Sequence, residues 1–128
     1  MSEIGSSAPV DKVVFAQKFA AVNDHWNPRI IGELNGQLIK IAKIEGAFDW
    51  HHHEAEDELF LVHRGTFRME FRDHSVDLTP GDMLIVPRGV EHRPVAEREA
   101  EIVMFEPAST LNTGNVVSEH TVRQLERI

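Results

Sequence analysis

From residue 28 onward, short apolar segments alternate with turn-forming glycine and proline residues, and this punctuation limits the possible folds more than any other feature. The turns include Asn35-Gly36, which favours a two-residue hairpin, and Pro80-Gly81. The expected strands are residues 29–34, 38–44, 47–53, 58–63, 67–72, 75–78, 83–86, 90–95 and 101–105. Many short strands with almost no helix predict an all-β sandwich or barrel.

The segment before residue 28 predicts one short helix and a flexible tail. Phe15, Phe19 and Val22 recur at helical spacing, which predicts an amphipathic helix over about 12–21 with Asp11 as its N-cap. Residues 1–10 are small and polar, as in a flexible N-terminal tail. The chain has 128 residues and a mass of 14.5 kDa. This is the size of one domain, which we expect to span residues 11–128.

Two strands show which faces are expected to be buried. Phe67, Met69 and Phe71 alternate with charged residues, which predicts one buried and one solvated face. By contrast, the segment 59–62 is apolar at every position and is expected to be buried on both faces.

Two of the eight histidines stand at metal-ligand spacing on an expected strand. Strand alternation places His51 and His53 on one face and His52 on the other. Two imidazoles about 6.6 Å apart along a strand can bend toward one ion. Glu58 follows on the face of apolar Phe60, where a carboxylate needs a partner such as a metal ion. A histidine pair of this kind also occurs by chance on surface strands, so the pattern alone leaves both interpretations open.

Two spaced groups of residues carry a resemblance to the cupin motifs. The first group is Gly46, His51, His53, Glu58 and Gly65, and the second is Gly81, Pro87, Gly89 and His92. The first gap is one residue shorter than in the usual motif, and Ala96 stands where the second motif has asparagine. That asparagine is not a metal ligand in the family, so its loss affects a structural contact only. The resemblance covers about residues 40–105.

The chain thus resembles a small stand-alone, single-domain cupin that carries both motifs. The resemblance implies a cupin-type jelly-roll barrel, here with a short N-terminal helix. It also implies one divalent metal ion in the barrel, bound by His51, His53, Glu58 and His92. Three imidazoles and a carboxylate suit Zn, Fe, Mn, Ni, Co or Cu, so the identity of the ion stays open.

Charge and composition restrict the partners. Thirteen Lys and Arg against twenty-one Asp and Glu give a net charge of −8. Such a surface repels phosphate, so we expect neither nucleic acid nor an anionic membrane as partner. There is no cysteine, and the N-terminus lacks a signal-peptide pattern. We therefore expect a cytoplasmic protein.

Several other polar residues have open roles. Asp57 is either part of a solvated turn or a hydrogen-bond acceptor for a ligand imidazole. Lys40 and Lys43 stand an odd number of positions apart on an expected strand, so their side chains point to opposite faces and only one can point inward. Arg93 either meets an anionic substrate or forms a surface salt bridge. We expect the remaining histidines, His25, His63, His74 and His120, to be incidental.

These observations support three functional hypotheses. An ion with four protein ligands keeps positions free for a small oxygen-rich molecule, as in a dioxygenase or an isomerase. The alternatives are a non-enzymatic binding or sensing module that contains a metal, and a purely structural metal. Leu59 and Leu61 point away from the Glu58 face, and we expect a homodimer that covers them.

Overall fold

The computed structural model describes residues 10–128, so nearly all of the tail expected at residues 1–10 lies outside the described residues. Within them, one short helix precedes eight strands. They are α1 (Phe15–Ala20), β1 (Arg29–Leu34), β2 (Gln37–Ala47), β3 (Glu58–Arg64), β4 (Phe67–Phe71), β5 (Ser75–Leu78), β6 (Met83–Val86), β7 (His92–Pro107) and β8 (Glu126–Arg127). The all-β jelly-roll prediction with one short N-terminal helix is therefore confirmed.

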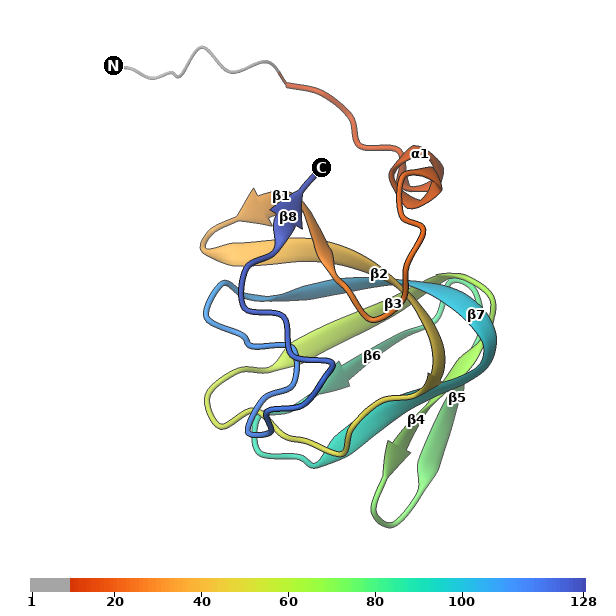
Figure 1. Cartoon of the computed structure of the whole chain (residues 1–128), viewed down its shortest axis with the longest axis vertical. Coiled ribbons are helices and arrows are strands. Elements are labelled where there is room, and N and C mark those ends of the chain that lie inside the picture. Colours follow the sequence, from red (N-terminus) through yellow and green to blue (C-terminus); the bar gives the residue numbers. More distant parts are fainter. Residues whose placement is uncertain (1–9) are drawn as a thin grey trace.

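Strand β7 organises the barrel because its two halves pair with different neighbours. It runs antiparallel to β2 along most of its length, and its first residues pair with β4 while its later residues pair with β3. The strand order is β5-β4-β7-β2-β1-β8, and β6 joins on the far side of β3. The long strands β2 and β7 thereby bend from one layer into the other (Figure 1), and the interior between the two layers is called the lumen below.

Two of the expected strands are in fact one. Residues 90–95 and 101–105 were expected as separate strands, but β7 continues through the polar segment between them. Ala96 still pairs with Gly46 and Ala100 with Ile44, so residues 97–99 of β7 stand opposite a single residue of β2 at this register shift. Gly46 has a φ of 86°, a left-handed backbone conformation that glycine adopts without strain and that accommodates this irregularity.

The expected strand at residues 47–53 is wrong. Strand β2 ends at Ala47, and beyond it only His51 forms an isolated bridge, to His92. By contrast, the hairpin expected at Asn35-Gly36 is present, with a positive φ at both residues.

The interior of the barrel is lined by one face of strands β2 to β7. Phe60 and Val62 of β3, together with Phe67 and Met69 of β4, belong to the buried cluster inside it. Phe71, expected on the same buried face, is only partly buried. Leu59 and Leu61 were expected to be fully buried, but each is only half-buried on the outer face of β3.

A second apolar cluster attaches α1 to the outside of the barrel. Phe19 and Val22 pack against Ile41 and Val103 on the outer face of β2 and β7. The helix is shorter than expected, and Asp11 does not cap it. Residues 11–13 are exposed, so no packing supports a helical turn there. Within residues 10–128, no helix is long and apolar enough to cross a membrane.

Candidate metal centre

Four residues from three parts of the fold meet near one end of the lumen. Glu58 is the first residue of β3, and His92 is the first residue of β7. His51 and His53 lie in the irregular segment between β2 and β3. All four side chains are buried. The structure thus brings together the four residues that the resemblance implied.

The irregular backbone allows the two neighbouring imidazoles to converge. His51 exchanges two backbone hydrogen bonds with His92, at 3.1 and 2.9 Å, and the carbonyl of His53 accepts one from Gly89 at 2.7 Å. The ring centroids of His51 and His53 are 5.0 Å apart, closer than the spacing of alternate residues on a regular strand. The loss of strand geometry after residue 47 therefore places both rings around one point.

The candidate ligand atoms lie at the separations that one shared ion requires. One ligand atom from each of the four residues lies within 4.8 Å of the other three. Nε2 of His53 and Nε2 of His92 are 3.0 and 3.2 Å from the same oxygen, Oε1 of Glu58. Two ligands at about 2.1 Å from one ion and at right angles to each other are about 3 Å apart.

Three of these atoms are buried and lack a hydrogen-bond partner within residues 10–128. They are Nε2 of His53, Nε2 of His92 and Oε1 of Glu58, whose short contacts do not have hydrogen-bond geometry. A buried polar atom without a partner costs about 1–3 kcal/mol, so three that converge on one point require an explanation. A divalent metal ion fits this set of nitrogen and oxygen donors.

Backbone carbonyls set the tautomers of two histidines. Nδ1 of His51 lies 2.8 Å from the carbonyl oxygen of Asp49, and Nδ1 of His92 lies 2.8 Å from that of Val90. Because a carbonyl oxygen only accepts, each Nδ1 carries the proton and each Nε2 keeps a free lone pair. Asp57 does not orient an imidazole; it is exposed and accepts hydrogen bonds from Arg88 instead.

Electrostatics keep the site in the form that binds a cation. Burial, followed by the neighbouring His92, lowers the pKa of His51 to about 4, so this ring is neutral at pH 7. Burial by itself would raise the pKa of Glu58, but the close contacts with His53 and His92 outweigh it and lower the pKa well below its ordinary value. A neutral imidazole beside a carboxylate anion is the state that metal binding needs.

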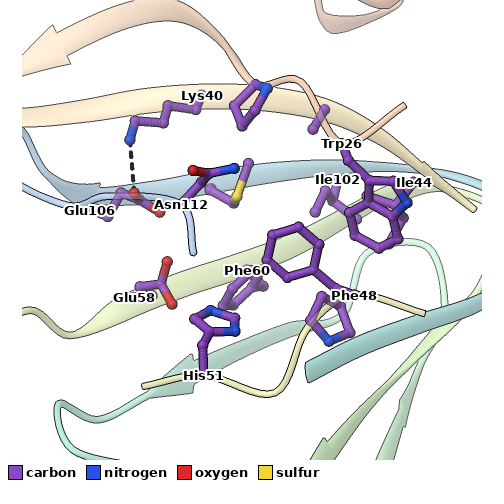
Figure 2. Close-up of a pocket in the computed structure, with 14 residues that line it drawn as sticks. Trp26, Lys40, Ile44, Phe48, His51, Glu58, Phe60, Ile102, Glu106 and Asn112 are labelled. Atoms are coloured by element: carbon purple, nitrogen blue, oxygen red, sulfur yellow. Dashed lines mark hydrogen bonds and ion pairs between the residues drawn. The ribbon is translucent and has the colours of Figure 1, made fainter. Parts of the chain in front are cut away.

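A pocket extends from the candidate ligands into the lumen. It has an empty volume of about 490 Å³, open mouth included, and both His51 and Glu58 line it. Aromatic rings of Trp26, Phe48 and Phe60 form one part of its wall (Figure 2). A pocket with apolar walls and a few convergent polar groups is typical of small-molecule sites.

The same pocket contains a buried ion pair that our sequence reasoning missed. Lys40 Nζ donates to Glu106 Oε2 at 2.8 Å, and each side chain is only 2 % exposed. Of the two lysines considered in β2, Lys40 is therefore the one that points inward. Burial, then the nearby Glu58 carboxylate, raise the pKa of Glu106 above its ordinary value against the effect of Lys40. The sequence did contain a signal that Glu106 points inward. Glu106 stands an even number of positions after buried Ile102, so both side chains share one face of the strand.

The C-terminal segment, residues 108–125, forms part of the site's support, which our sequence reasoning also missed. Asn115 accepts a hydrogen bond from the backbone N–H of His52 through Oδ1 and donates its own N–H to the carbonyl of His52. A Cβ at Gly114 would lie 2.1 Å from the carbonyl oxygen of His52. In Figure 1 this dark-blue segment returns along the end of the barrel that carries residues 48–57.

The remaining candidates from the sequence have surface partners. The imidazole of His52 points away from the candidate ligands and pairs with Glu54. Arg93 Nε donates to Glu70 at 2.8 Å, and its guanidinium lies 5.0 Å from the ring centre of Trp50, so it forms a salt bridge outside the lumen. The other four histidines, His25, His63, His74 and His120, each lie beside a carboxylate.

Comparisons with known proteins agree with this architecture. A family model described as "Cupin domain" matches residues 37–106, more than half of the chain. A cupin-2 domain containing protein from Shewanella frigidimarina is 44% identical with a TM-score of 0.73, and the match covers 74% of this chain and 93% of that one. Protein NMB1881 from Neisseria meningitidis is 29% identical with a TM-score of 0.70, over 77% and 100% of the two chains. The uncharacterized protein YdbB of Bacillus subtilis is 34% identical over 87 residues, which cover 59% of this chain and 77% of YdbB.

Proposed function

The chain belongs to the cupin family, and we propose that it binds one divalent metal ion and uses it to hold a small oxygen-rich molecule in the lumen. The ligands in this proposal are His51, His53, Glu58 and His92. The observation that carries it is the convergence of three buried, unpartnered donor atoms from separate parts of the fold.

The pocket beside the ligands supports a binding or catalytic role over a structural one. A metal that only stabilises a fold is normally enclosed by its ligands, whereas His51 and Glu58 also line a pocket that opens to solvent. Once bound, a divalent ion would polarise an oxygen atom of the small molecule as a Lewis acid. The protein's own contribution is to orient His51 and His92 through their Nδ1 hydrogen bonds and to exclude water with aromatic side chains.

Within this proposal we place the protein among metal-dependent enzymes of the isomerase or dioxygenase class. The alternative, a non-enzymatic binding module, uses the same ligands and the same pocket. Turnover separates the two. The enzyme consumes or rearranges the molecules that bind, whereas the binding module releases them unchanged.

Metal analysis of matched variants tests the ligand set. Protein purified without metal-affinity chromatography and loaded with Zn²⁺ or Mn²⁺ is expected to hold one ion per chain. His51→Ala, His53→Ala, Glu58→Ala and His92→Ala should each strip or sharply weaken binding. His52→Ala is the control, because the same substitution one residue away removes a side chain that pairs with Glu54. Equal metal loss in His52→Ala, or full metal content in the four variants, would refute the site.

A ligand screen tests the open site. Oxalate and catechol present two oxygen atoms to an ion, and each should raise the melting temperature of metal-loaded protein but not of metal-free protein. A hundredfold excess over Kd stabilises a protein by about 2.7 kcal/mol. Oxygen uptake or rearrangement of bound small molecules then identifies an enzyme. Failure of every bidentate ligand to shift the melting of the loaded form would favour a purely structural ion.

A further inference from the structure

The buried pair of Lys40 and Glu106 lies beside Glu58 but supplies none of the four candidate metal ligands. Lys40 lies in β2 and Glu106 near the end of β7, and both point into the pocket that His51 and Glu58 also line. Figure 2 shows Glu106 beside the end of the Lys40 side chain, with Glu58 on the neighbouring strand β3. The pocket therefore has two adjacent polar groups, the candidate ligands and this pair, with Glu58 and Glu106 as neighbours.

Stability alone does not explain why the chain places this pair inside the barrel. Removing two charged groups from water costs about as much as their mutual attraction returns, and apolar replacements of similar size are often neutral or stabilising. Each side chain is only 2 % exposed, so neither partner keeps its hydration. A costly pair of this kind, inside a pocket that candidate metal ligands also line, indicates a binding role.

Glu106 also has hydrogen-bonding capacity that the protein does not use. Oε2 accepts from Lys40, but Oε1 is buried and has no partner within residues 10–128. The amide of Asn112, another polar group of the pocket, is already occupied, because Nδ2 donates to the carbonyl of His120 and Oδ1 accepts from Val122. The free Oε1 of Glu106 and the remaining N–H groups of Lys40 are thus available to a ligand.

We propose that Lys40 and Glu106 bind the distal hydroxyl groups of a polyhydroxylated carboxylic acid whose carboxylate and 2-hydroxyl face the metal ligands. A hydroxyl group suits this pair because it both donates and accepts, and so can bond Oε1 of Glu106 and Nζ of Lys40 together. The aromatic wall formed by Trp26, Phe48 and Phe60 then covers the carbon chain. The inference rests on the proposed function and names the substrate class of that same site.

Matched pairs of acids test this specificity on the full chain loaded with Mn²⁺. The probes are glycerate against lactate, erythronate against 2-hydroxybutyrate, and gluconate against 2-hydroxyhexanoate. Within each pair the chelating end and chain length are equal, and only the first acid has distal hydroxyls. Calorimetry should show, for at least one pair, that the polyhydroxylated acid binds about tenfold to a hundredfold more tightly.

Variants connect that preference to the buried pair. The double variant Lys40→Met with Glu106→Met should abolish the preference while metal content stays at the wild-type value. Its metal-free form should be as stable as the wild type or more stable. Glu106→Gln conserves the size of the side chain and should weaken the binding of the polyhydroxylated acid only. The reason is that a neutral amide accepts a hydrogen bond from a hydroxyl less strongly than a carboxylate does. Glu101→Gln is the control, since Glu101 lies on the same strand but pairs with His63 outside the pocket.

The outcomes separate this inference from the metal proposal. If loaded wild-type protein holds no ion, the proposed function fails. If it holds the ion but binds both acids of every pair equally, or binds none of the six acids, only the present inference is overturned. A preference that persists in both the double variant and Glu106→Gln also overturns it.

Discussion

Substituting Gly114 with alanine should damage the metal centre from a distance, through the backbone of the irregular segment. Gly114 lies in the C-terminal segment with a φ of 56°, in the left-handed region. A Cβ there would meet the carbonyl oxygen of His52 at 2.1 Å and Cδ2 of His51 at 3.1 Å. The first contact is with backbone, which cannot move aside by rotating a side chain. The segment that holds two candidate ligands must therefore shift.

The magnitude follows from two separable costs. A left-handed alanine costs about 1–2 kcal/mol relative to its relaxed conformation. Overpacking a well-packed site adds about 1–3 kcal/mol. Gly114→Ala should therefore lower the free energy of unfolding by about 2–5 kcal/mol. Displacing the groups that support a ligand typically weakens metal affinity by about 10–100-fold, and we expect a loss of that order.

Gly36→Ala is the matched control for the backbone term. Gly36 has a φ of 77° in the hairpin between β1 and β2, and a Cβ at this position would have no heavy atom within 4 Å. This variant should show only the left-handed cost, about 1–2 kcal/mol, with unchanged metal affinity. Urea unfolding of the metal-free proteins and competition with a chromophoric chelator measure the two quantities. Equal stability and equal metal affinity in the two variants would refute the steric argument.

Two further predictions concern the outer surface of the barrel. Phe19→Ala should lower the free energy of unfolding by about 3–5 kcal/mol in urea unfolding but leave metal affinity unchanged, because Phe19 packs in the cluster outside the lumen. A folded Phe19→Ala protein that no longer binds metal would contradict this separation of the clusters. We also propose a homodimer formed on the outer face of β3 and β6, where Leu59 lies opposite exposed Ile85 and Leu61 opposite exposed Met83. Light scattering should give twice the chain mass for the wild type and a monomer for Ile85→Lys, and a wild-type monomer at every concentration would refute the homodimer.

Much of the fold and the candidate ligand set could be predicted from sequence because the relevant signals are local. Alternation along one strand is enough to place Glu58 on the buried side with Phe60, and the structure has both buried on the same face of β3. The hairpin at Asn35-Gly36 depends on two adjacent residues that tolerate a positive φ. The spacing of the histidines and glycines also supports the family resemblance without any knowledge of packing.

Other features depended on which segments meet, and these only the tertiary structure decided. Lys40 and Glu106 are 66 positions apart and face one another because β2 and β7 pair in a register that sets Lys40 opposite Met104 and Leu38 opposite Glu106. The support of the irregular segment by Gly114 comes from the opposite end of the chain. The alternation of residues along one strand predicts which side chains share a face, but it does not predict which other strand that face packs against. Convergence of distant residues is a property of the closed barrel, whose register is chosen by the packing of all its strands together.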